Sequence, residues 1–240
     1  MKYHKTILIL TALLVSGAFA SAQTADEIIT RYIQAVGGRE FLTGITSLYT
    51  ENKIEIMGNE TIQKTTLLNG KGYKAEMDIM GSPLVTCYTD KGGWTINPYT
   101  GGTEATEMPE SQYNAGKDEI YICSPFLNYV EKGYKAELMG NEVVGSVDAV
   151  KVKLTAPDNT SSTFFFDPAT WYILKNIQQE EMQGQIVENT ILFSDYRTTE
   201  GYTLPYNIKI NIGGMFDMTS TVTKVEINKP VDPAIFVKPQ

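Results

Sequence analysis

The segment Tyr73-Lys74-Ala75-Glu76-Met77-Asp78-Ile79 alternates strictly between apolar and charged side chains. Successive side chains of a β-strand point to opposite faces of a sheet, so this pattern predicts a strand with one buried and one solvated face. The same period recurs in residues 149–154 and 206–212. The apolar positions there are Val150, Val152 and Leu154, followed by Tyr206, Ile208, Ile210 and Ile212. Together these segments predict one continuous antiparallel sheet with an apolar face.

The two-residue period begins near Leu48 and continues over most of the chain. Turn-forming pairs such as Asn69-Gly70, Asp167-Pro168 and Glu200-Gly201 separate the apolar runs. Counting these runs predicts a mainly β fold of about ten or eleven strands. Because each strand has one apolar face and helices are few, we expect an open or half antiparallel β-barrel with helices packed on its concave face.

Three helical pieces and one short turn accompany the predicted strands. Thr24 and Glu27 form a capping box, and apolar residues at helical spacing continue until Gly37-Gly38. A second short turn is expected at 40–45. Between residues 98 and 131, Pro109-Glu110-Ser111 and Ser124-Pro125 each resemble a helix start.

The N-terminus resembles an export signal. Lys2 and Lys5 precede an apolar run from Thr6 to Val15, and Ala20-Ser21-Ala22 matches a cleavage site. We expect a signal peptide at 1–22, a single domain at 23–240 and a periplasmic product, with a retained signal anchor as the alternative. No cysteine follows the run, so no lipid attachment is expected there.

Composition argues against several function classes. The chain has one histidine, His4, which lies in the predicted signal peptide, so histidine bases, Ser-His-Asp triads and most zinc sites are not expected. The formal net charge of −8 disfavours nucleic acid as a partner, and removing two lysines with the signal would make the chain more acidic. We expect no catalytic residues, no metal site and no cofactor.

Two alternatives concern acids and cysteines. Glu76 with Asp78, and Glu51 with Glu55, have spacings that a glycosidase or a calcium site could use, but their alternation with apolar residues favours a solvated face. The two cysteines, Cys87 and Cys123, allow one disulfide, although buried free thiols fit their apolar surroundings equally well.

The order of these landmarks resembles the periplasmic lipoprotein carriers of the LolA type and their outer-membrane lipoprotein-sorting relatives. The resemblance covers nearly all of the mature chain. It rests on four segments, which are Tyr88-Thr89-Asp90-Lys91-Gly92-Gly93-Trp94-Thr95-Ile96-Asn97-Pro98, Phe166-Asp167-Pro168-Ala169-Thr170, the hairpin from Ser194-Asp195-Tyr196-Arg197 to Leu204-Pro205, and the closing Phe236-Val237-Lys238-Pro239. In the carriers an arginine near the second or third strand helps to hold a lid shut, whereas this chain has Lys71 at that position.

The resemblance implies an unclosed barrel whose apolar cavity accepts the acyl chains of a lipoprotein or a lipid, with an inner- or outer-membrane delivery partner. We expect a non-enzymatic, monomeric carrier or chaperone. Its candidate cavity residues are Ile54, Ile56, Tyr73, Met77, Ile79, Trp94, Ile96, Ile208 and Ile210. A filled barrel that recognises another protein, as an envelope-stress sensor would, is the alternative.

Methionines fit either interpretation of the barrel interior. Beyond the first residue the chain has Met57, Met77, Met80, Met108, Met139, Met182, Met215 and Met218. Their flexible side chains suit variable lipid tails, but they also fill irregular cores.

Overall fold

The computed structural model describes residues 23–99, 102–182 and 185–239, with side chains not described at 180–186. The predicted signal peptide at 1–22 lies outside these ranges. Within them, no helix is long and apolar enough to cross a membrane.

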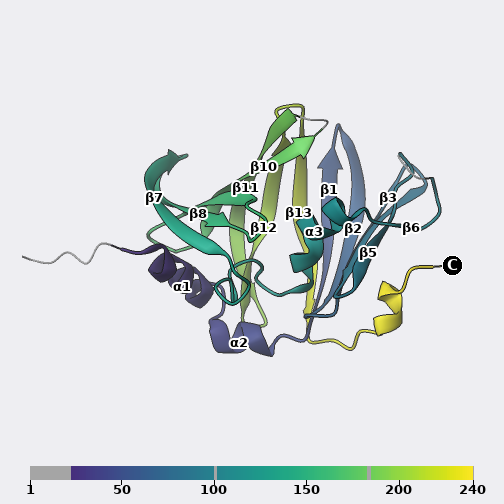
Figure 1. Cartoon of the computed structure of the whole chain (residues 1–240), viewed down its shortest axis with the longest axis horizontal. Helices are drawn as coiled ribbons and strands as arrows, with labels where there is room; N and C mark the ends of the chain where they lie inside the picture. The colour runs from purple at the N-terminus through teal and green to yellow at the C-terminus, as the bar shows by residue number, and fades with distance from the viewer. Residues whose placement is uncertain (1–22, 100–101, 183–184, 240) are drawn as a thin grey trace, which may run out of the picture.

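Thirteen strands in the described residues form one antiparallel sheet, rather than the predicted ten or eleven (Figure 1). In chain order they are β1 (Ser47–Ile56), β2 (Asn59–Leu68), β3 (Gly72–Ile79), β4 (Ser82–Thr89), β5 (Gly92–Ile96), β6 (Thr106–Glu107), β7 (Lys135–Val144), β8 (Val147–Thr155), β9 (Ser161–Phe166), β10 (Ile173–Met182), β11 (Gln185–Thr199), β12 (Tyr202–Ile212) and β13 (Phe216–Ile227). The sheet is curled but not closed, because β6 and β7 are its two edges. The open-barrel prediction is therefore confirmed, and the extra strands include two edges with little apolar patterning.

Two meanders make up this sheet. Strands β1 to β6 pair in sequence order, as do β7 to β13, and β1 pairs with β13 to join the two sets. The joining register runs from Leu48 opposite Ile227 to Ile56 opposite Met218. As a result, the chain between β6 and β7 must pass from one edge of the sheet to the other.

The predicted N-terminal helix is confirmed as α1 (Ala25–Ala35), and both hydrogen bonds of the Thr24–Glu27 capping box are present. A short α2 (Arg39–Gly44) follows. The face of α1 bearing Ile28, Ile29 and Ile33 is buried in one core with apolar residues of β8 and β9, chiefly Val152, Leu154, Phe164 and Phe166. Burying each such side chain contributes about 1.5–3 kcal/mol, so this core fixes the helix to one half of the sheet.

The connection between the two edges, which we call the crossing segment (residues 108–134), contains α3 (Glu110–Gly116) and the 3₁₀ helix η1 (Lys117–Ile120). The helix predicted at Ser124-Pro125 does not form, and residues 122–133 are turns. Cys123 and Asn128 have φ of 55° and 63°, which a right-handed helix cannot contain. Figure 1 shows the segment in front of the central strands, while the hairpin ends above remain uncovered.

The C-terminal segment forms a second core on the convex face. The 3₁₀ helix η2 (Pro233–Phe236) packs Phe236 against Val85, Cys87 and Trp94. The indole N–H of Trp94 donates a hydrogen bond of 2.8 Å to the Phe236 carbonyl oxygen. Both faces of β3 to β5 are therefore covered in part, one by the crossing segment and one by the chain end.

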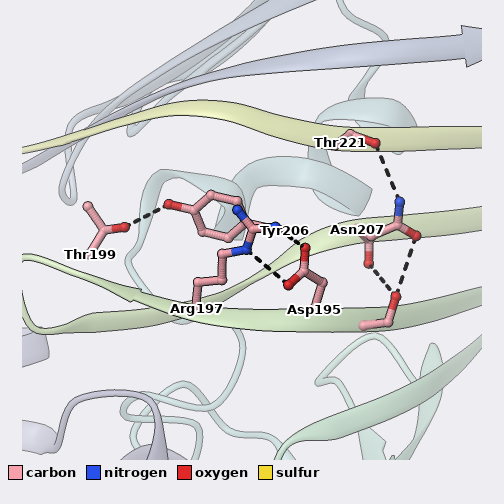
Figure 2. A network of polar contacts seen from close by, with 7 residues as sticks. Asp195, Arg197, Thr199, Tyr206, Asn207 and Thr221 are labelled. Carbon is pink, nitrogen blue, oxygen red and sulfur yellow. Dashed lines mark hydrogen bonds and ion pairs between the residues drawn. The ribbon is translucent and has the colours of Figure 1, made fainter.

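Cross-strand pairing largely confirms the predicted apolar face, with Tyr206 as the exception. Its ring lies 4.7 Å from the Arg197 guanidinium, and its hydroxyl hydrogen-bonds to Thr199 (Figure 2). Arg197 is 59% exposed and forms an ion pair of 2.6 Å with Asp195. Because Asp195 has a φ of 54°, the alternation along β11 is interrupted beside Tyr206, which joins this surface network instead.

A substitution at Gly72 tests the packing of Phe236 in the second core. A Cβ at this position would lie 2.6 Å from the Phe236 ring, whereas a Cβ at Gly44 would meet nothing within 4 Å. Gly72→Ala should lower the free energy of unfolding by about 1–3 kcal/mol through overpacking. Gly44→Ala, the matched control, should stay within about 0.5 kcal/mol. Denaturant titration measures both, and equal midpoints for the two variants would contradict the packing described.

Candidate functional site

Two adjoining cavities lie on the concave side of the sheet, against the crossing segment. The first, about 240 Å³, lies between α1, strands β1 to β3 and residues 119–124. The second, about 280 Å³, lies between residues 115–125 and strands β9 to β11. Glu119 and Ser124 line both. Together the two hollows reach the range of roughly 300–1,000 Å³ that is typical of small-molecule sites.

Tyrosines dominate the first hollow. Tyr32 of α1, Tyr73 of β3 and Tyr202 of β12 line it with Thr50 and Thr65. Burial raises the pKa of all three phenols, most clearly for Tyr32 and Tyr202. Their hydroxyls therefore stay neutral hydrogen-bonding groups. The hollow offers aromatic rings and neutral hydroxyls rather than the purely apolar wall expected from the sequence.

The second hollow has a more mixed wall. Leu154, Phe164, Ile191 and Phe193 line it together with Asn176. A third cavity of about 480 Å³ shares part of its wall, namely Ala115, Asp118, Tyr134, Ala156 and Thr160. The second hollow therefore adjoins an opening between the crossing segment and the β8–β9 hairpin.

Three ionisable side chains of the crossing segment lie at these hollows. Asp118 accepts a hydrogen bond of 2.8 Å from the Tyr134 hydroxyl and lies 3.6 Å from the Lys132 ammonium. The same ammonium lies 3.7 Å from the centre of the Tyr121 ring. Burial lowers the pKa of Lys132 and raises the pKa of Glu119, which the neighbouring Asp118 raises further. Lys132 and Asp118 thus form an ion pair, although the buried Lys132 ammonium has no hydrogen-bond partner among the described residues.

The crossing segment is attached to the β2–β3 turn. The Ile122 N–H donates to Asn69 Oδ1 at 3.2 Å, and the Gly70 N–H donates to the Ile120 carbonyl at 2.7 Å. Asn69 is itself held by a 2.8 Å bond from Nδ2 to the Ile45 carbonyl. In this chain, backbone groups and an asparagine make the attachment, while Lys71 lines a groove on the convex side.

Aromatic packing and two polar contacts attach the segment to the N-terminal helices. The Phe126 ring lies 4.9 Å from Tyr32 and 4.7 Å from Phe164. Arg39 donates to Asn128 at 2.8 Å, and the Tyr129 hydroxyl donates to Asp26. These contacts fill the barrel between α1 and β9, so the hollows occupy only part of the concave side.

Seven of the nine candidate cavity residues share the concave face. Tyr73 lines the first hollow. The other six form what we call the apolar trough, which consists of Ile54, Ile56, Met77, Ile79, Ile208 and Ile210. Cross-strand pairs connect Ile54 with Ile208 through Ser220, and Ile56 with Ile210 through Met218. Met77 pairs with Gln63, which pairs with Asn52, two residues before Ile54 on the same face of β1. Ile54 is buried and the other five are half-buried.

The trough continues into the second hollow. Phe193 pairs with Ile208, and Ile191 pairs with Ile210, across β11 and β12. Phe193 and Ile191 line that hollow. The structure thus brings the predicted residues next to a cavity, although most of them lie beside it.

Trp94 and Ile96, which the sequence groups with the trough, lie on the opposite face. Trp94 pairs with Cys87, which pairs with Lys74. Lys74 follows Tyr73 in β3, so Lys74, Cys87 and Trp94 share the face opposite Tyr73. The side chains of Trp94 and Ile96 pack in the second core with Phe236. Alternation shows which residues share a face within a strand, but not which face becomes concave.

A groove of about 860 Å³ beside Trp94 is the largest cavity described. It lies between the β4–β5 hairpin, β6, α3 and the chain end. Lysines and acids both line it, including Lys238, which lies 3.4 Å from Glu107. Because this groove is separated from the trough by the sheet, it is not part of the concave site.

Methionines lie mainly outside the hollows. Met57, Met80 and Met215 stand at the tips of the β1–β2, β3–β4 and β12–β13 hairpins and are 77%, 86% and 63% exposed. Met77 and Met218 lie on the concave face, whereas Met108 packs beside Gly93. The side chain of Met182 lies outside the described residues. Three exposed methionines therefore stand at hairpin tips rather than in the hollows.

The acids and cysteines singled out in the sequence make ordinary structural contacts. Glu76 forms an ion pair of 2.8 Å with Lys74, and Asp78 accepts the Gly81 N–H at 2.7 Å. Cys87 lies in the second core and Cys123 lines the first hollow, and both are free thiols. Among the described residues no group of acids, histidines and cysteines is arranged to hold a metal ion.

Sequence patterns missed Tyr32, Glu119 and Tyr202 as hollow-lining residues. These residues come from a helix, the crossing segment and a strand end, so no single periodicity connects them. One local signal was present, because buried Ile120 and Ile122 alternate with Glu119 and Tyr121. That alternation would predict an extended piece with one buried side, although Glu119 and Ile120 lie in η1 in the structure.

Comparison with solved structures gives the fold. A DUF1329 family protein from Desulfovibrio piger superposes with a TM-score of 0.62 and 13% identity, over 89% of this chain and 95% of that chain. A LolA superfamily protein from Nitrosomonas europaea superposes with a TM-score of 0.61 and 12% identity, over 90% of this chain and 99% of that chain. A putative outer membrane lipoprotein-sorting protein domain from Vibrio parahaemolyticus superposes with a TM-score of 0.58 and 13% identity, over 88% of this chain and 95% of that chain.

Sequence comparison adds nothing to this result. No family model matches the chain, and no curated protein matches it. The three structures match most of the chain at low identity, so the likeness concerns the fold. The chain therefore has the LolA-like fold.

Proposed function

We propose that this protein is an exported, periplasmic binding protein that holds the acyl chains of a lipoprotein or a lipid for sorting to the outer membrane. The observation that carries the proposal is the continuity of the apolar trough with the second hollow through Ile191 and Phe193. Half-buried apolar side chains on a concave sheet are available to a ligand without unfolding any core. The fold supports a binding role.

The attachment of the crossing segment supports access to the site. Asn69 Oδ1 accepts the Ile122 N–H and the Gly70 N–H donates to the Ile120 carbonyl at one end of the segment. The middle of the segment shares the buried core under α1 through Phe126, Leu127 and Tyr129, so widening of the hollows is confined to the end held by Asn69 and Gly70. The segment therefore acts as a cover over the acyl site, with residues 23–240 working as one domain.

A protein-recognition module is the second candidate. Packing of Phe126 against Tyr32, Phe164 and Phe166 fills the barrel beside the hollows. A barrel filled in this way would leave its surfaces for another protein, as an envelope-stress sensor requires. Acyl binding separates the two candidates, because a filled barrel takes up no lipid.

The trough is tested by Ile79→Asn. Because Ile79 is only half-buried, the change should lower affinity for a fluorescent fatty-acyl probe about five- to tenfold, or roughly 1–1.4 kcal/mol, while the denaturant midpoint changes little. Ile62→Asn is the matched control, since Ile62 pairs with Lys53 on the convex face and is 44% exposed. It should alter neither quantity. Wild-type protein that binds no acyl probe would rule out the carrier.

The cover is tested by Asn69→Ala, which removes the bonds to Ile45 and Ile122. Loss of these partly buried hydrogen bonds should cost about 1–3 kcal/mol, speed amide exchange at residues 120–123 and raise the dissociation rate of the probe. Asn207→Ala is the control, because the Asn207 side chain is hydrogen-bonded to Ser194 and Thr221 on the sheet surface, away from the crossing segment (Figure 2). Faster exchange with an unchanged dissociation rate would show that the segment does not cover the site.

A further inference from the structure

Glu119 lies where the two hollows meet. Its side chain lines both of them and is accessible to solvent there, although the atoms packed around it raise the pKa of its carboxyl group by desolvation. Within the described residues its carboxyl group has neither a hydrogen bond nor an ion pair. It is therefore the charged group that a ligand in the concave site would meet first.

Lysine and arginine are missing from the described residues that line these two hollows. Lys132 is the cation that acts on Glu119, but its ammonium is buried beside Asp118 and the Tyr121 ring, and the residue lines neither hollow. A phosphate or carboxylate bound beside Glu119 would therefore find no lysine or arginine on the described walls of the hollows. Repulsion between like charges in a partly buried site disfavours such a ligand strongly.

Residues with neutral hydrogen-bonding groups share the first hollow with Glu119. The hydroxyls of Tyr202, Thr50 and Ser124 line the same walls. Within the described part of the chain, no hydrogen bond of the Tyr202 hydroxyl is recorded. A ligand hydroxyl or amide N–H can donate to Glu119, and its carbonyl can accept from Tyr202.

Resting on the proposed function, we infer that the ligand is a neutral amphiphile whose head group carries hydrogen-bond donors and lies beside Glu119. Its acyl tail runs along Ile191 and Phe193 into the apolar trough. Glu119 then determines specificity, because it accepts a donor from a neutral head group and rejects an anionic one. Anionic phospholipids and free fatty acids are excluded by the same carboxylate.

The test compares monomyristoylglycerol with myristate, which have the same acyl chain, at a pH where myristate is ionised. Each competes with the fluorescent acyl probe. Wild-type protein should bind the neutral lipid at least about tenfold more tightly. In Glu119→Gln the ratio should fall to about twofold, mainly because myristate binds better. Glu110→Gln, in the same segment but lining the convex groove, should keep the wild-type ratio.

The outcomes separate this inference from the proposed function. Equal wild-type affinity for the two lipids, or an unchanged ratio in Glu119→Gln, would overturn the head-group assignment while acyl binding stands. Binding of neither lipid would overturn both. The wild-type ratio tests the assignment even if Glu119→Gln has a lowered denaturant midpoint.

Discussion

Pairing of β1 with β13 is the constraint on which this structure depends. In the described chain, every other strand pair joins strands that are neighbours in sequence. The β1–β13 ladder alone turns two meanders into one sheet and brings Ile54 and Ile56 beside Ser220 and Met218. Without it, the apolar trough would be divided between two separate sheets. It also places β6 and β7 at opposite edges, so their connection has to pass across the sheet, and it takes the concave side.

The crossing segment thus lies over the concave side of the sheet because it joins the two edge strands, β6 and β7. Its sequence then determines how the cover is fastened and what it presents inward. Ile120 and Ile122 bury its apolar side, while Glu119 and Tyr121 face the hollows. The same piece of chain that satisfies the strand order therefore supplies the charge that would select a ligand.

Sequence patterns predicted the open barrel, the capped helix α1 and the shared face of the trough residues, because each follows from local periodicity or capping. They could not predict which face of β5 is concave, since that depends on where the distant Phe236 packs. They also could not collect Tyr32, Tyr202 and Glu119, which meet only in the folded chain. The turns at 122–133 replaced a predicted helix because long-range contacts of Phe126 outweigh the Ser124-Pro125 start.

An unclosed barrel has two strand edges, and unpaired edges are the usual route to strand-by-strand aggregation. One edge, β6, has only two residues, which is too short to act as a template. The other, β7, has ten residues and exposed Leu138, Met139 and Val143. A register shift between Leu138 and Asn141, with Gly140 at a φ of 81°, breaks its ladder and turns the strand. The bulge at Gly140 therefore allows the sheet to stay open for a ligand while limiting the addition of a second molecule.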